Sequence, residues 1–166
     1  MADTRVQVEV EDWVRENWMR ERFRQDFYRN RIKLLSGGVF DFDAVNVDKS
    51  IVASISTSGS KTSGGKHAVG KMMKLRSDML FLLLAEAPTK RYIVLTEESM
   101  YAACLKEKAG GRTPQEIEFL WAKIPAELES RLVKARAMAS KEVSSATLED
   151  VLPDELLLPG AESNNE

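Results

Sequence analysis

The sequence contains one cysteine, one histidine and no long apolar run, and each scarcity excludes a class of protein. With Cys104 as its only cysteine, the chain can form neither an internal disulfide nor a thiol cluster for zinc. His67 is the only histidine, so neither a histidine-based metal site nor a Ser-His-Asp triad can be built elsewhere. The apolar stretch 79–85 is far shorter than the roughly 18 residues that a membrane-spanning helix needs. We therefore expect no membrane association.

The start of the chain also lacks a basic segment followed by an apolar one, which is the order found in secretory signals. We therefore expect a cytoplasmic location. A chain of 166 residues that is 43% hydrophobic and 30% charged has the size and composition of one globular domain. We expect a single domain over residues 1–144, followed by an acidic and partly disordered C-terminal tail over 145–166.

The net charge of −2 conceals an uneven distribution along the chain. Residues 141–166 carry a net charge of −6, whereas residues 1–140 carry +4. Between residues 57 and 77 there is no acid, and the five bases there are Lys61, Lys66, Lys71, Lys74 and Arg76. Such a zone suits phosphate, although a pI of about 5.6 argues against a strongly electrostatic DNA-binding protein.

Hydrophobic periodicity and turn residues predict an α/β protein with a mixed sheet. An amphipathic helix is expected over 6–31, where apolar residues recur at three- to five-residue steps. The other expected elements are strands over 32–36, 39–46 and 51–58, a helix over 66–87, a strand over 92–95, and helices over 97–108, from 114 to the interruption at Pro125, and over 127–142. The helix that ends before Pro125 is predicted because Thr113, Pro114 and Glu116 have the order of a capped helix start. The glycine-rich segment 58–65 is expected to be a loop without regular structure.

Two of the expected strands, joined by the polar turn 46–50, carry the residues that suggest a chemistry. Strict alternation along 39–46 would place two phenylalanines and Ala44 on one face, and Asp41, Asp43 and Val45 on the other. The second strand carries small hydroxyl side chains in the tripeptide Ser54-Ile55-Ser56.

This order of elements, over residues 8–97, resembles the core of the PD-(D/E)xK nuclease superfamily, the restriction-endonuclease-like fold. In that family, a strand aspartate and the acid of an E-x-K tripeptide on the next strand hold Mg²⁺, and the lysine orients the attacking water. The resemblance implies an αβββαβ core with a mixed central sheet, extended here by additional C-terminal helices. It also implies that Asp43 stands at the aspartate position.

The chain departs from the family pattern at the E-x-K tripeptide, where both functional places are serine, Ser54 and Ser56. A neutral hydroxyl is a poor ligand for Mg²⁺ and cannot take the role of a lysine. We therefore expect a degenerate site, in which Asp43 is the metal ligand if Mg²⁺ binds at all. Asp41 projects to the same face as Asp43 and is its candidate partner.

Two substitutes for the missing groups are open. A lysine from the following loop, Lys61 or Lys66, could move into the place of the family lysine. A third acid could come from the first helix, where Glu16 and Glu21 are the candidates.

The loop that ends in Gly64-Gly65-Lys66 has part of the pattern of a Walker A loop. It has Ser60 where a glycine is needed and His67 where the Mg²⁺-binding serine or threonine should stand, so the pattern does not support nucleotide hydrolysis. Backbone amides at the start of the next helix, with Lys61, Lys66 and His67, still form a candidate phosphate-binding corner. The alternative is a solvated basic loop.

The sequence thus leaves three functions open. The first expectation is a non-catalytic or strongly impaired PD-(D/E)xK-like domain that needs no cofactor and binds DNA or RNA weakly, or serves as an assembly module. The second is a Mg²⁺-dependent endodeoxyribonuclease with a relocated site that uses Asp41, Asp43 and a nearby lysine. The third is a protein-binding homodimer that keeps the fold as a scaffold.

Overall fold

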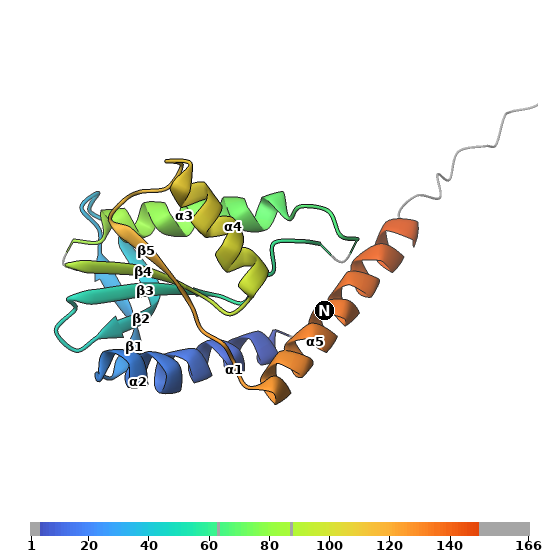
Figure 1. Cartoon of the computed structure of the whole chain (residues 1–166), viewed down its shortest axis with the longest axis horizontal. Helices are drawn as coiled ribbons and strands as arrows, with labels where there is room; N and C mark the ends of the chain where they lie inside the picture. The colour runs from blue at the N-terminus through green and yellow to red at the C-terminus, as the bar shows by residue number, and fades with distance from the viewer. Residues whose placement is uncertain (1–3, 63, 87, 150–166) are drawn as a thin grey trace, which may run out of the picture.

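The computed structural model describes residues 4–62, 64–86 and 88–149, and it forms one sheet with helices on both faces (Figure 1). In spatial order the strands are β1 (Phe27–Lys33), β2 (Val39–Asn46), β3 (Ile51–Ser56), β4 (Lys90–Leu95) and β5 (Ile117–Trp121). The first three strands pair antiparallel, and β3, β4 and β5 pair parallel. The predicted α/β class and mixed sheet are confirmed.

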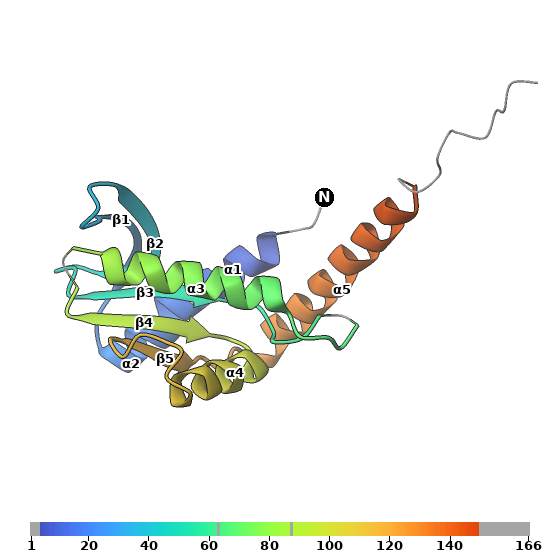
Figure 2. The ribbon, with the colours of Figure 1, turned by 90° about the horizontal axis from the view of Figure 1, so that it is seen from above.

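The helices form two layers around the sheet (Figures 1 and 2). One layer contains α3 (Val69–Leu84) and α4 (Glu98–Ala109), which connect the parallel strands. The other layer contains the N-terminal helical segment and the first part of α5 (Ala126–Glu149). The N-terminal segment is divided into α1 (Arg5–Trp13), the π-helical η1 (Val14–Met19) and α2 (Arg20–Phe23).

Each face of the sheet has its own apolar core. The core under α3 and α4 contains Phe42, Leu75, Leu82, Ile93 and Ile117. The core under the N-terminal helix and α5 contains Val10, Val14, Met19, Ala53 and Leu132. Every residue of β3 is buried, as expected for a central strand that is covered on both faces.

The helix α5 extends beyond the body of the protein (Figures 1 and 2). Leu132 is fully buried, and Arg131 pairs with Glu9 of α1 at 2.6 Å. Farther along, Arg136 pairs with Glu97 at 3.0 Å and also donates a hydrogen bond to the carbonyl of Thr57. The helix predicted over 127–142 is therefore present, and it is longer at its C-terminal end. It includes the first five residues of the tail expected over 145–166, whose remainder lies outside the described residues.

The expected helix over 6–31 is too long, because the chain leaves the helix after Phe23. Arg24 has a left-handed backbone, with φ of +55°, and ends α2. The strand expected over 32–36 instead begins at Phe27, which is 4% exposed and packs edge-on against the ring of Phe23. Burial of Phe27 in the core therefore decides this boundary.

The helix expected from Pro114 to Pro125 does not form, because Ile117–Trp121 is the strand β5. This strand pairs with β4 along its whole length, and Ile117 is fully buried. The hydroxyl of Thr113, which would cap that helix, is buried and has no hydrogen-bond partner within the described residues. Pairing with β4 therefore overrides the local capping signal.

The loop expected over 58–65 is more ordered than its composition suggests. Lys61 and His67 form an antiparallel bridge, and the N–H of Thr62 donates to the carbonyl of Lys66 at 2.8 Å. The helix expected over 66–87 begins later, at Val69. Lys66 and His67 consequently lie before the helix rather than at its first turn.

The turn between β2 and β3 depends on Asn46, which is 2% exposed. Its Oδ1 accepts a hydrogen bond from the N–H of Ile51 at 2.9 Å, and its Nδ2 lies 2.8 Å from Oε1 of Gln25. We predict that Asn46→Ala lowers the free energy of unfolding by about 1–3 kcal/mol, because the buried N–H of Ile51 loses its acceptor. Urea denaturation followed by circular dichroism measures this. Asn30→Ala, at an exposed position of β1, is the control; equal losses in the two variants would contradict the prediction.

Candidate active site

An irregularity in β2 sets the position of Asp43. Along β1, one residue separates the partners of Val45 and Phe42, whereas two residues, Asp43 and Ala44, separate them along β2. The strand therefore contains an extra residue, a β-bulge. Phe42 packs in the core under α3 and Ala44 in the core on the opposite face. The strict alternation expected along this strand is therefore wrong.

The backbone pairing of β2 with β3 includes Ala44 and Val45. At the preceding residue, the side chain of Asp43 bonds to β3. The N–H of Ile55 donates to Oδ2 of Asp43 at 2.8 Å, in place of a backbone pair. Ile55 lies between Ser54 and Ser56, which are 4% and 9% exposed. The structure thus brings the predicted aspartate beside the tripeptide that the sequence assigned to the same site.

The N-terminal helical segment holds the backbone of Asp43. Nη1 of Arg15 donates to the carbonyl oxygen of Asp43 at 2.8 Å, and the same guanidinium pairs with Asp12. Arg15 is 9% exposed and belongs to η1. Short π-helical segments widen a helix locally and are frequent at functional sites. The buried Arg15 therefore joins η1 directly to the bulge.

On the opposite face, α3 contributes Lys74 and Asp78. Nζ of Lys74 lies 2.9 Å from Oδ2 of Asp78, and Asp78 is 8% exposed. An aspartate this deeply buried is normally paired with a cation, and Lys74 supplies that pairing here.

Burial raises the pKa of Asp43 above its ordinary value. The hydrogen bond from Ile55 and the charge of Lys74 oppose this rise, whereas the negative charge of Asp78 adds to it. The charge of Asp78, on α3, therefore acts on Asp43, on β2.

A third acid joins them from α1. Burial raises the pKa of Glu11 to about 6, and the negative charge of Asp43 adds to the rise. The positive charges of Arg29, Lys74 and Arg15 act in the opposite direction. We call these six residues the fork cluster: Glu11, Arg15, Arg29, Asp43, Lys74 and Asp78.

The other predicted site residues lie elsewhere. Asp41 is exposed and pairs with Arg29 at 3.2 Å. Glu16 and Glu21 are exposed and line a polar hollow of about 550 Å³ at η1 and α2. The acid that the first helix contributes near Asp43 is Glu11, which precedes both of these glutamates by more than one helical turn.

The three residues of the predicted phosphate-binding corner, Lys61, Lys66 and His67, are exposed on the bridged loop before α3. The lysine of the fork cluster is Lys74 of α3. Neither loop lysine is among the charges that act on Asp43 or Glu11.

Sequence reasoning missed Glu11, Arg15 and Asp78 as site residues and placed Lys74 merely in a basic zone. One signal was available for the α3 pair. Asp78 is the single acid in the helix and stands before the apolar run 79–85, four residues after Lys74. An acid that stands before an apolar run and four residues after a lysine indicates a buried carboxylate that is paired with that lysine.

Within the described parts of the chain, no three histidine, cysteine, aspartate or glutamate side chains lie close enough together to hold a metal ion. No helix there is long and apolar enough to cross a membrane. Comparisons with protein-family models, curated proteins and solved structures gave no match.

The raised pKa of Glu11 has a measurable consequence for stability. Because the pKa is higher in the folded protein than its ordinary 4.5, folding favours the protonated acid. The contribution of Glu11 to stability is therefore greatest below pH 4.5 and falls as the pH rises to about 6.

We predict that Glu11→Gln stabilises the protein at pH 8 and has little effect at pH 4.5. The full pKa change corresponds to about 2 kcal/mol. Partial exposure of the side chain reduces the expected gain to about 1 kcal/mol. Urea denaturation at both pH values measures the difference, with Glu16→Gln on the exposed side of η1 as the control. A gain of equal size at both pH values would mean that titration of Glu11 is not its cause.

Proposed function

We propose that the protein is a Mg²⁺-dependent endodeoxyribonuclease of the PD-(D/E)xK type, with the acid and the lysine of the second strand relocated to α3. The observation that carries this proposal is the Lys74–Asp78 pair, in which the exposed Lys74 holds the buried Asp78 and both charges act on Asp43. The family chemistry needs an acid and a lysine beside the strand aspartate. Here the two groups come from the helix above the strand.

The lengths of the elements support this relocation. The crossover from β3 to its parallel neighbour β4 makes α3 run antiparallel to β3. Lys71 lies near the end of β3, because its charge interacts with that of Arg136, which is bonded to Thr57. Seven residues of helix, from Lys71 to Asp78, span about 10 Å. Three residues of strand, from Thr57 to Ser54, also span about 10 Å.

By this measure Asp78 lies over the part of β3 that contains Ser54, and Lys74 lies nearer to Ser56. These are the two places where the family carries its acid and its lysine. Serine is small and leaves room beneath α3 for the buried carboxylate of Asp78, which Lys74 pairs with from the surface. The serines and the helical pair are therefore two parts of one rearrangement.

The charges of the region fit a divalent cation. Three cations of the fork cluster, Arg15, Arg29 and Lys74, face a larger number of carboxylates. The carboxylates in contact with these cations or within the cluster are Glu11, Asp12, Asp41, Asp43 and Asp78. Burial raises the pKa values of Glu11 and Asp43, and the charge of a neighbouring carboxylate adds to each rise, Asp43 for Glu11 and Asp78 for Asp43; a bound cation would oppose both rises.

The donor set also fits the habits of Mg²⁺, which often takes one or two carboxylates from the protein and the rest from water and substrate phosphate. Asp43 and Asp78 would hold the ion, with Glu11 nearby. When bound, it would supply positive charge to the scissile phosphate and to the attacking water. Asp78 keeps the ammonium of Lys74 oriented, and Arg15 fixes the backbone of Asp43.

A second candidate function is a non-catalytic nucleic-acid-binding or assembly module on the same fold. Two observations favour it: serine stands at both functional positions of β3, and the described residues contain no three-ligand metal cluster. In that case the fork cluster would be a structural charge network, and phosphate would meet Lys61, Lys66 and His67 on the exposed loop.

The two candidates predict different results with DNA. We expect the purified protein to nick supercoiled plasmid with Mg²⁺ or Mn²⁺, and chelation with EDTA to stop the reaction. Asp43→Asn and Asp78→Asn should each reduce the rate by about 100-fold, the upper end of the 10- to 100-fold cost of losing an outer-shell partner of a metal site. The control is Asp41→Asn, which removes an exposed carboxylate and should leave the rate nearly unchanged. If the unmodified protein cuts plasmid no faster than the Asp43→Asn variant does, the result would favour the non-catalytic module.

Relocation itself can be tested by moving the acid back. We predict that Asp78→Ser abolishes cutting and that adding Ser54→Glu restores at least part of it, because the carboxylate returns from α3 to β3. The matched control is Ser54→Gln with Asp78→Ser, which has the same side-chain length without the charge and should stay inactive. Circular dichroism checks that each variant folds. Equal rates in the glutamate and glutamine variants would contradict the relocation.

A further inference from the structure

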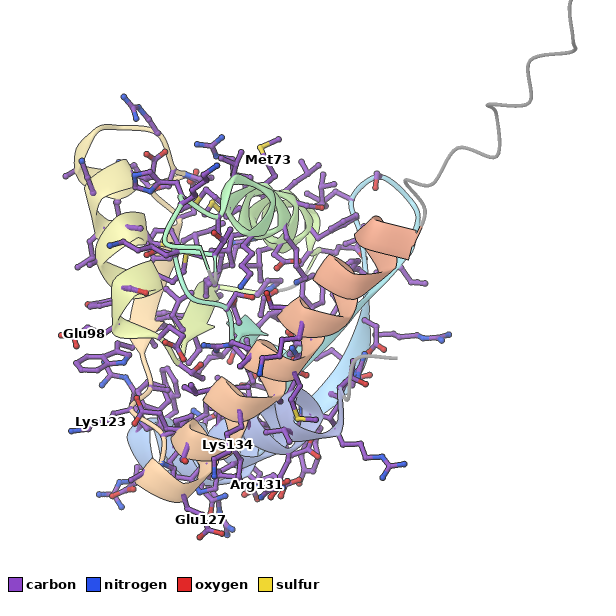
Figure 3. All side chains as sticks on the ribbon, turned by 90° about the vertical axis from the view of Figure 1, so that its right-hand side faces the viewer. Met73, Glu98, Lys123, Glu127, Arg131 and Lys134 are labelled. Carbon is purple, nitrogen blue, oxygen red and sulfur yellow. The ribbon has the colours of Figure 1, made fainter. Side chains whose placement is uncertain are left out.

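A groove of about 320 Å³ lies between α3 and α4, away from the fork cluster. Its apolar lining contains Val69, Met72 and Met73 from α3, and Met100 and Ala103 from α4. Val69 is 67% exposed and Met73 is 55% exposed, and Met73 lies at the outer side of α3 (Figure 3). Exposed methionines form surfaces that adapt to an apolar partner.

The charged rim of the groove is positive. Glu107 accepts from Arg76 at 3.0 Å and from Arg112 at 3.2 Å, and these bonds lower its pKa. Lys106 and one of the two arginines therefore remain as excess positive charge, and His67 stands at the edge of the groove. An occupant should combine leucine-like side chains with carboxylates.

We propose that residues 150–158 of the same chain bind in this groove. Their sequence is Asp-Val-Leu-Pro-Asp-Glu-Leu-Leu-Leu, which has five apolar residues, three acids and no base. Both properties of the groove are thus matched by one segment. The proposal does not depend on nuclease activity.

The segment is long enough to reach the groove. Arg136 fixes α5 to Thr57 and Glu97, and the 13 helical residues from there to Glu149 span about 20 Å. The near end of the groove is at Ser60, three residues after Thr57. Nine further residues in extended form span about 30 Å. Such a tether also gives the segment a high effective concentration at the groove.

The path from α5 to the groove passes the bridged loop, whose cations Lys61 and Lys66 are exposed. Asp150, Asp154 and Glu155 would face this loop and the rim, while the three leucines after Glu155 enter the groove. The bound segment would then compete with any anionic ligand for the loop.

A spin label on the full chain tests this placement. Leu157→Cys provides the label site, since Cys104 is fully buried and its pKa is raised to about 11 by burial, which makes it unreactive. We expect the nitroxide to broaden the amide signals of residues 69–73 and 100–106, and to leave those of β1 sharp. The broadening should decrease in about 1 M NaCl, where charges are screened beyond about 3 Å. Unmodified protein treated with the same reagent controls for labelling at Cys104.

Surface variants give the specific control. Met73→Asp puts a negative charge into the groove and should remove the broadening, whereas Val133→Asp changes an equally exposed apolar residue of α5 and should not. Absence of broadening in the groove of the labelled protein would overturn the proposal. So would broadening that arises when ¹⁵N protein is mixed with labelled unenriched protein, because the occupant would then be a second copy.

Discussion

The hydrogen bond from the N–H of Ile55 to the carboxylate of Asp43 is the contact on which the arrangement of this protein depends. It stands where a backbone pair of the β2–β3 ladder would otherwise be, and it exists because the bulge turns Asp43 toward β3. A carboxylate placed there lies between the two helical layers. Glu11 can then approach from α1, and the Lys74–Asp78 pair from α3, without any of them leaving its helix.

The carboxylates of this cluster lose solvation on burial, whereas its cations Arg29 and Lys74 stay more than half exposed. The raised pKa values of Glu11 and Asp43 show that neither the arginines nor Lys74 fully compensate for lost solvation. A site with uncompensated negative charge lowers stability in the absence of a cation, and perturbed carboxylates of this kind are concentrated at functional sites. A purely structural network would be more stable with fewer charges. This imbalance is the main physical argument for an ion-dependent role over a scaffold.

The sequence was a good guide to elements decided by local chemistry and a poor one to positions decided by pairing. The strand pair β2–β3, α4 with its end at the glycines after Ala109, and β4 follow from periodicity and turn residues. The bulge at Asp43 does not, because Ala44 and Val45 are both apolar and the pattern does not show which of them shares the face of Phe42. Thr113 is a good helix cap by composition, yet the edge of β4 recruits the residues after it into a strand. Glu11 looked like any acid on an amphipathic helix, since the burial that distinguishes it comes from β2 and α3.

Because the N-terminal helix contains the π-helical segment η1, the number of residues in this helix is itself constrained. Each added or removed helical residue rotates the remainder of the helix by about 100°. Deleting one residue from 14–19 would give a regular α-helix, but Glu11 and Met19 could then no longer both face the sheet. Substitutions at exposed positions such as Asn17 do not change which residues of the helix face the sheet. Related proteins that keep this site should therefore vary freely in the composition of the segment while conserving its number of residues.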